Sequence, residues 1–140
     1  MKKTLFYILS WTWGLPMSLI GLCASGVLKK KGCKPKKHGW CRHYEYGNGW
    51  GGVNFGPIFI TSVGASEHTK NHEHGHALQN CVWGPLMPFV ISIPSAIRYW
   101  NRVFQQKQGK KLEPYDAIWF EGQATKWGDA FMEEINNGDN

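Results

Sequence analysis

The pattern of hydrophobic and polar positions separates an uncharged first segment from a mixed remainder. Residues 4–28 (TLFYILSWTWGLPMSLIGLCASGVL) contain no charged side chain and are bounded by lysines on both sides. This run is longer than the roughly 20 apolar residues that a membrane-spanning helix requires, so it favours a single transmembrane helix. A cleaved signal peptide fits less well, because the run is long and Cys23-Ala24-Ser25 is a poor cleavage site.

A membrane hairpin is the alternative to a single span. Gly14-Leu15-Pro16 would bend the run near its middle. Each arm would then be too short to cross the bilayer, so the segment would dip in and return. Trp11 and Trp13 favour this alternative, because tryptophan prefers the membrane interface to the bilayer core in which a single span would place them.

Alternation and turn signals indicate a β-hairpin after the first segment. Residues 40–46 alternate in character, and Gly47-Asn48-Gly49 is a strong turn signal. Residues 50–62 (WGGVNFGPIFITS) are β-prone towards their end, and their glycines permit bulges or a close backbone approach. We expect an antiparallel pair of strands here.

Three helical segments are predicted in the second half of the chain. Ser66 is a suitable N-cap for a helix that runs to Trp83 and stops at a Gly-Pro pair. The apolar residues 86–100 are too few to span a membrane and contain two prolines, so a buried or membrane-surface helix is expected. Pro114 opens a last helix that extends to about Ile135, and residues 136–140 form a frayed tail.

The net charge of +6 depends on one cluster of basic residues. Residues 29–42 contain no acid and hold seven basic side chains: Lys29, Lys30, Lys31, Lys34, Lys36, Lys37 and Arg42. The other nine basic residues face ten acids. Lysines beside an apolar segment face anionic headgroups and mark the cytoplasmic side of a membrane. We therefore expect the rest of the chain in the cytoplasm, and no binding of nucleic acid.

The four cysteines show no CxxC spacing. Cys33 and Cys41 lie near His38 and His43 in the sequence, so a small zinc site or a disulfide is conceivable there. The spacing matches no common zinc module, which favours reduced and unpaired thiols.

A candidate metal site lies in the predicted helix that begins after Ser66. His72-Glu73-His74-Gly75-His76 fits the pattern HExxH. Positions i and i+4 of a helix lie one turn apart on the same face, so His72 and His76 can bind one Zn²⁺. Glu73 is displaced around the helix, where it can take a proton from a water molecule on the metal and act as general base. His74 lies off this face, and both His74 and His68 are expected to be solvated or hydrogen-bonded.

A catalytic zinc site needs a third protein ligand and an open position for water. No histidine follows His76, and Glu121 is the favoured third ligand. The residues on its helical face are small: Ala117, Ala124, Thr125 and Gly128. Small residues let two helices approach closely enough for a short carboxylate to reach a metal held by the first helix. Asp116 and Asp129 remain alternative ligands, and a structural salt bridge is the alternative role for Glu121.

These motifs resemble those of the gluzincin metallopeptidases, in which a glutamate on a later helix completes an HExxH zinc site. In particular, the chain is similar over residues 5–130 to small bacterial membrane proteins with the motifs HExGHxxQ, GPL-x-P, IPS and WxExxA. The motifs stand here as HEHGHALQ (72–79), GPLMP (84–88), IPS (93–95) and WFEGQA (119–124).

The resemblance implies an α+β, zincin-like fold. Residues 1–28 would form the membrane anchor, as a helix or hairpin, and residues 29–140 the metallopeptidase domain. This domain would combine a small antiparallel β-sheet, the HExxH helix and a C-terminal helix that carries the glutamate. An edge strand from residues 50–62 would bind an extended substrate beside the active-site helix.

The chain departs from the gluzincin pattern next to the third ligand. Many gluzincins carry an aspartate four residues after the glutamate, hydrogen-bonded to a zinc histidine, and this position is Thr125 here. A hydroxyl could orient the histidine, although more weakly, and Asp129 is a second candidate for this role. Tyr99 and Tyr115 are candidates for stabilising an oxyanion, as are Arg98 and His68, and the sequence does not choose among them.

The sequence thus predicts a membrane-anchored zinc metallopeptidase that acts on peptides or membrane proteins. Its zinc would be held by His72, His76 and Glu121, with Glu73 as the general base. The alternative is a non-catalytic membrane protein that uses a zinc site for stability or partner binding. An intramembrane protease is disfavoured, because Glu67, Lys70 and Asn71 make the HExxH helix too polar for the bilayer core.

Overall fold

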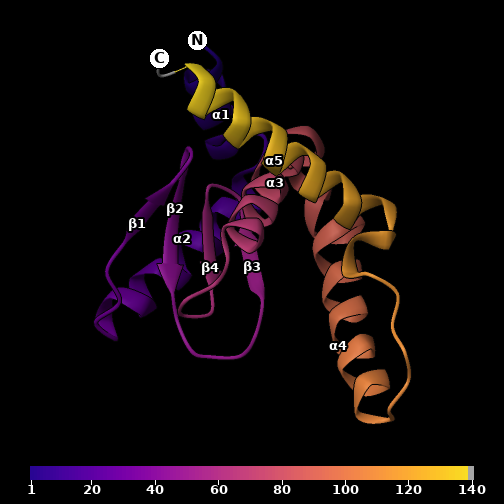
Figure 1. Cartoon of the computed structure of the whole chain (residues 1–140). Coiled ribbons are helices and arrows are strands. Elements are labelled where there is room, and N and C mark those ends of the chain that lie inside the picture. Colours follow the sequence, from indigo (N-terminus) through magenta and orange to yellow (C-terminus); the bar gives the residue numbers. More distant parts are fainter. Residues whose placement is uncertain (139–140) are drawn as a thin grey trace.

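The computed structural model describes residues 1–138, which form five α-helices and a four-stranded sheet (Figure 1). The predicted α+β class is confirmed. The α-helices are α1 (Lys2–Trp11), α2 (Leu15–Lys30), α3 (Glu67–Trp83), α4 (Ile93–Lys107) and α5 (Trp119–Gly138). The strands are β1 (Lys36–His38), β2 (Cys41–Glu45), β3 (Gly52–Phe55) and β4 (Ile58–Thr61). Short helical turns cover Gly84–Leu86 (η1), Pro88–Ser92 (η2, a π-helix) and Tyr115–Ala117 (η3).

The uncharged first segment forms two helices, so the prediction of one continuous helix is wrong. The helices α1 and α2 meet at an angle of 85°, and the break precedes Leu15-Pro16, where the sequence allowed a bend. A Cβ atom on Gly14 would overlap the side chain of Asn80, so the glycine lets the bend lie against α3. Among residues 1–138, no single helix is both long and apolar enough to cross a bilayer. Two pairs of helices are long and apolar enough when the members of each pair are counted together, but both pairs are sharply bent. These pairs are α1 with α2, and α3–η1 with η2–α4.

The sheet is mixed, which corrects the predicted antiparallel hairpin of residues 40–62. Its strand order is β1-β2-β4-β3, with β4 antiparallel to β3 but parallel to β2. The tight hairpin joins β3 to β4 instead, and the glycine-rich residues 46–51 carry the chain across to the sheet edge (Figure 1). The most apolar strand, β4 (IFIT), is buried along its whole length in the interior of the sheet, whereas the glycine-containing β3 lies at the edge. Burial of the apolar strand explains why this order is preferred.

The two faces of the sheet are covered by different helices. Ile58 and Ile60 pack with Tyr44 and with Leu28 of α2 on one face. Phe59, which points the other way, packs with Phe6 of α1 and Ala77 of α3. The sheet therefore holds α3, which carries the HExxH motif, in a fixed position.

The predicted helix after Ser66 is confirmed, including its cap. The Ser66 hydroxyl accepts a hydrogen bond from the Thr69 backbone N–H at 3.2 Å, and α3 ends at Trp83. The last helix begins later than predicted, because Tyr115–Ala117 form a separate 3₁₀ turn, and it continues to Gly138 instead of ending near Ile135. Positions 139 and 140, the end of the predicted tail, lie outside the described residues.

The helices α3 and α5 approach each other through glycines. A Cβ atom on Gly75 would overlap the carbonyl of Ala124, and one on Gly128 would overlap the carbonyl of Asn71. The small helical face predicted around Glu121 therefore forms the contact with α3. This contact lets a carboxylate on α5 reach the histidines of α3.

Replacing Gly128 with alanine is expected to destabilise the protein by about 3 kcal/mol, because an added methyl group would have to displace the backbone of α3. Chemical unfolding should measure this loss. The control is Gly26→Ala, since nothing lies within 4 Å of a Cβ atom there. That helical substitution should leave the free energy of unfolding unchanged or raise it by up to about 1 kcal/mol. Equal stability of the two variants would contradict the close contact between α3 and α5.

Candidate metal centre

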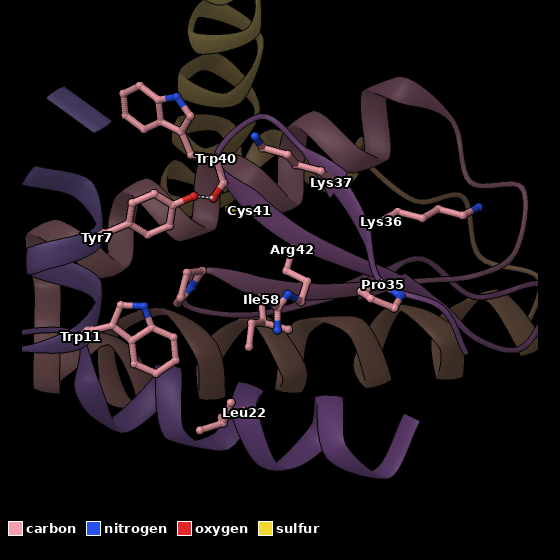
Figure 2. A pocket seen from close by; sticks show the side chains of 11 residues that line it. Tyr7, Trp11, Leu22, Pro35, Lys36, Lys37, Trp40, Cys41, Arg42 and Ile58 are labelled. Atoms are coloured by element: carbon pink, nitrogen blue, oxygen red, sulfur yellow. Dashed lines mark hydrogen bonds between the residues drawn. The ribbon is translucent and has the colours of Figure 1, made fainter. Parts of the chain in front are cut away.

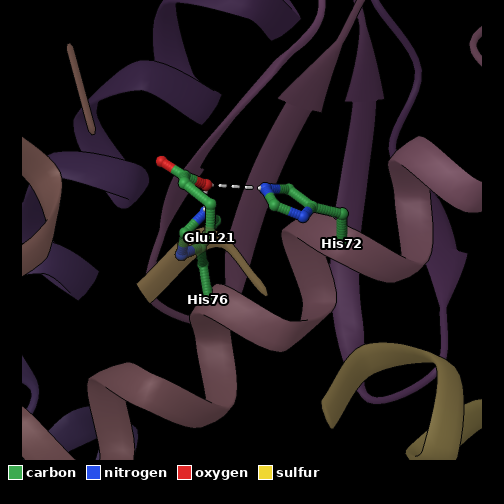
Figure 3. A group of neighbouring side chains, drawn as sticks. All are labelled: His72, His76 and Glu121. Atoms are coloured by element: carbon green, nitrogen blue, oxygen red, sulfur yellow. Dashed lines mark hydrogen bonds and ion pairs between the residues drawn. The ribbon is translucent and has the colours of Figure 1, made fainter. Parts of the chain in front are cut away.

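Three predicted ligands from two helices converge in the structure. His72 and His76 lie one turn apart on α3, and Glu121 projects from α5 towards both rings (Figure 3). Glu121 Oε2 lies 3.0 Å from His72 Nε2 and 3.2 Å from His76 Nε2. The three potential ligand atoms all lie within 4.8 Å of one another, so this group could hold a metal ion. We call it the metal group.

Each imidazole of the metal group is oriented by a second hydrogen bond. His72 Nδ1 lies 2.8 Å from the Thr125 hydroxyl, and His76 Nδ1 lies 2.7 Å from the side-chain oxygen of Gln79. Thr125 was a predicted partner. Gln79 was not predicted in this role, although its position three residues after His76 on one helix would have been sufficient to suggest it.

The orientation of Gln79 determines which nitrogen of His76 carries a proton. The Gln79 amide nitrogen donates to the Phe120 carbonyl at 2.8 Å and to Gln123 at 3.0 Å, so its oxygen is the atom that faces His76. This oxygen accepts a hydrogen bond from Nδ1–H. In a neutral His76, the Nε2 lone pair then points towards a carboxylate oxygen of Glu121. Two lone pairs facing each other require a positive charge between them, which a metal ion or a proton supplies.

Glu121 is fully buried and remains ionised. Burial alone would raise the pKa of its carboxyl group, but hydrogen bonds with His72 and His76 outweigh this effect and hold the pKa well below its usual range. The Ser95 hydroxyl of α4 donates a hydrogen bond to Oε1, the other carboxylate oxygen. Ser95 thus leaves Oε2 to the histidines. Because Ser95 lies in a different helix, the sequence alone gave no reason to place it here.

The chemistry of this donor set fits a zinc ion. Two imidazole nitrogens and one carboxylate oxygen are donor atoms that zinc binds, and the second ring nitrogen of each imidazole is hydrogen-bonded. Within residues 1–138, the metal group contains no fourth histidine, cysteine or acidic ligand. The four cysteines are all unpaired, as predicted, and none belongs to the group.

Glu73 lies beside the metal group without joining it. Its side chain is 5% exposed, and its Oε2 has no hydrogen-bond partner among the described residues. Burial raises the pKa of Glu73 above its ordinary value, while the neighbouring His76 and His72 oppose this rise and Glu121 adds to it. A buried carboxylate oxygen without a partner is costly, and a catalytic role is one reason why native proteins retain such a group. This arrangement suits a group that exchanges protons with a water molecule.

The edge strand β3 starts, at Gly52, next to the side chain of Glu73. A Cβ atom on Gly52 would lie 2.7 Å from the Glu73 carboxylate, so only glycine lets the strand approach this closely. Asn54 fixes the contact further along, because its amide donates to the Glu73 carbonyl at 2.9 Å. β3 pairs with β4 on one side only. Its Gly52 end therefore places an unpaired strand edge next to the proposed general base.

Of the candidates for oxyanion stabilisation, Tyr115 lies nearest to the metal group. Its ring centroid is 6.1 Å from that of His72, and its hydroxyl lies 3.3 Å from that of Ser95. Burial raises the pKa of Tyr115 to about 12, so the hydroxyl keeps its proton and can donate it. Arg98 is engaged with the Tyr115 carbonyl, Tyr99 packs against Trp100, and His68 is exposed on the first turn of α3.

Asp129 and His74 make contacts that stabilise the fold around the metal group. Asp129 accepts a hydrogen bond from Asn71 at 3.0 Å, and it contacts neither ligand histidine. His74 is buried, accepts a hydrogen bond from the Trp40 backbone N–H at 3.2 Å and stacks on Phe131 at 4.1 Å. Burial lowers the pKa of His74 to about 3, so the ring is neutral. The prediction of a hydrogen-bonded His74 is confirmed, and Asp129 does not orient a ligand.

A cavity of about 450 Å³ lies elsewhere, between α1, α2 and the first two strands (Figure 2). It is lined by Tyr7, Trp11, Leu22, Pro35, Lys36, Lys37, Trp40, Cys41, Arg42, Pro57 and Ile58. The Tyr7 hydroxyl donates to the Trp40 carbonyl at 2.8 Å across one end of it. None of these residues belongs to the metal group, so this cavity is separate from the candidate centre.

Replacing Thr125 with valine is expected to weaken zinc binding by roughly 10–100-fold, because valine has the same shape but cannot bond to His72. Competition with a chelating dye measures the affinity. Thr125→Ser, which keeps the hydroxyl, should bind zinc nearly as well as the unchanged protein. If the valine variant retained full affinity, Thr125 would have no part in orienting His72.

Comparisons with known proteins add no relative. A scan against protein-family models, a search of curated proteins and a search of solved structures each found no match. The resemblance to gluzincins therefore stays a prediction.

Proposed function

We propose that the protein is a zinc-dependent metallopeptidase. The observation that carries this proposal is the convergence of His72, His76 and Glu121, with the unpaired carboxylate oxygen of Glu73 beside them. These two imidazoles and one carboxylate would hold a zinc ion as three protein ligands, the number found in catalytic sites. A structural zinc site is closed by four protein ligands.

The proposed reaction is hydrolysis of a peptide bond. Bound zinc would supply a Lewis acid that lowers the pKa of a coordinated water to about 7 and polarises the substrate carbonyl. Glu73 takes a proton from the attacking water as the new carbon–oxygen bond forms. Glu73 then returns this proton to the leaving amine as the carbon–nitrogen bond breaks. The protonated Tyr115 hydroxyl is the group proposed to donate a hydrogen bond to the developing oxyanion, because its ring lies 6.1 Å from that of His72.

The substrate is proposed to bind as an extended peptide along β3. An unpaired strand edge can add a further strand through main-chain hydrogen bonds. Gly52 places the start of this edge against Glu73, so a peptide paired with β3 would present its backbone to the general base. This geometry favours peptides over compact substrates.

We also propose that the bent pair α1–α2 contacts a lipid bilayer, as the uncharged residues 4–28 predict. Exposed apolar side chains on this pair, including Leu5, Ile8, Leu19 and Ile20, support the proposal. The lysines that follow would then place the metal group on the cytoplasmic side of the membrane.

The proposed activity is tested on the purified full-length protein with a library of fluorogenic peptides. We expect hydrolysis that a zinc chelator such as 1,10-phenanthroline abolishes and that added Zn²⁺ restores. A non-chelating isomer of phenanthroline is the matched control. The alternative of a non-catalytic zinc site predicts bound zinc without hydrolysis of any peptide in the library.

A further inference from the structure

One side of η2 and α4 carries five large apolar side chains that project into solvent. They are Phe89, Ile93, Ile97, Trp100 and Phe104, with exposed fractions from 49% to 70%. Their spacing of three or four residues places them along one face of the helix. No residue of α4 is buried. We call this face the α4 stripe.

The opposite side of α4 is held by polar contacts, which fix the direction of the stripe. Ser95 bonds to Glu121, and Arg98 bonds to the Tyr115 carbonyl at 3.1 Å. Arg102 bonds to the Glu113 carbonyl at 2.6 Å and lies over the Tyr115 ring. Figure 1 shows α4 extending away from the sheet, with the segment that leads to α5 alongside it. Rotation that would bury the stripe against the protein would break all of these contacts.

The charges in the chain segment that carries the stripe are of one sign. No acid occurs between Glu73 and Glu113, and this stretch holds five basic residues. Lys107, Lys110 and Lys111 follow the last apolar residue of the stripe and are exposed. The other long acid-free stretch, residues 1–44, contains the exposed apolar helices α1 and α2 and nine basic residues. Fourteen of the sixteen lysines and arginines therefore lie in these two stretches, which contain no acid. Glu113 follows on the side of α4 that faces away from the stripe, where its carbonyl accepts from Arg102.

The two apolar regions meet at one point of the fold. Met17 near the start of α2 packs in one cluster with Met87 and Ile91, and the Ser92 hydroxyl lies 3.8 Å from the Met17 sulfur. The stripe is therefore joined through this cluster to the bent pair α1–α2. A second protein copy would bring the same lysines to the same face, so like charges would oppose its docking there.

We propose that the α4 stripe inserts into the surface of an anionic lipid bilayer. An amphipathic helix with an apolar face and flanking lysines lies in the interface plane, with its apolar side chains among the acyl chains and its ammonium groups near lipid phosphates. Because Ser95 of the same helix contacts Glu121, the metal group is held at the membrane surface. The inference does not depend on hydrolysis.

The test is photocrosslinking of the full-length protein reconstituted with vesicles. The photoreactive residue p-benzoylphenylalanine is introduced in place of Ile97, in the stripe, or in place of Gln106, an exposed residue on the opposite side of α4. The vesicles contain phosphatidylcholine alone or a mixture with phosphatidylglycerol. Intact-protein mass spectrometry detects the mass of an added lipid.

We expect lipid adducts from position 97 and few from position 106. Anionic lipid should strengthen docking by roughly fivefold for each lysine near the surface, so the adduct yield from position 97 should fall in neutral vesicles. Equal yields from the two positions would overturn the proposal. Crosslinked dimers from position 97 would also overturn it and would identify the stripe as an interface between copies. The metal content of each labelled protein, measured in parallel, reports separately on the proposed function.

Discussion

Replacing Glu73 with glutamine is expected to lower kcat/KM for peptide hydrolysis by roughly 10²–10⁴-fold, the usual contribution of a general acid–base group. Glutamine keeps the size of the side chain but cannot take a proton from water. Because Glu73 is not one of the converging ligands, the variant should bind zinc as well as the unchanged protein. Peptide hydrolysis and zinc content are measured on the same sample.

The matched control is Glu67→Gln, which makes the same chemical change on the first turn of α3. Glu67 is exposed and bonds to Lys70 at 3.1 Å, far from the chemistry proposed for Glu73. We expect this variant to keep full activity. An active Glu73→Gln enzyme would overturn the assignment of the general base, whereas a Glu73→Gln protein without zinc would show that this carboxylate supports the metal directly.

Removing Glu121 is expected to have the second large effect. Glu121→Ala should lose its zinc on dialysis. Its loss of zinc affinity should exceed the roughly 10–100-fold that is expected when only a hydrogen-bonding partner of a ligand is removed. The substitution deletes one of three ligands and leaves His72, His76 and Ser95 without their common partner. Elemental analysis of the dialysed protein measures the change.

The control for this variant is Glu133→Ala, an exposed acid on the same helix, which should keep its zinc. A second variant, Glu121→Gln, separates loss of the ligand from loss of fold because it preserves the size of the buried side chain. Circular dichroism should show intact helices in Glu121→Gln together with reduced zinc. Full zinc occupancy in both Glu121 variants would mean that the metal lies elsewhere.

The sequence predicted the metal group because each part of it depends on local periodicity. His72 and His76 share a face whenever residues 67–83 are helical, and that helix has a clear cap and stop. Glu121 was predicted from the small residues around it, and Gly128 does form the contact with α3. Thr125 was expected from the resemblance to gluzincins, because it stands four residues after Glu121, where many of them carry an aspartate.

The parts that were missed depend on segments distant in the sequence. The position of β4 between β2 and β3 results from burial of its apolar residues, which competes with the turn signal at Gly47-Asn48-Gly49. Ser95 reaches Glu121 only because α4 crosses the end of α5, and no spacing in the sequence encodes this contact. The bend between α1 and α2 was an alternative in the sequence analysis, but its packing against Asn80, a residue of α3, could not be read from the sequence.

The most direct test of the central claim is X-ray absorption at the zinc edge of the purified protein. The metal group predicts two imidazole nitrogens at about 2.0–2.1 Å, with carboxylate and water oxygens at about 2.0–2.2 Å. The multiple-scattering signal of the two imidazole rings in this spectrum should decrease when His76 is replaced with alanine. A shell of sulfur at about 2.3 Å, or a spectrum that His76→Ala and Glu121→Ala leave unchanged, would contradict zinc binding by His72, His76 and Glu121.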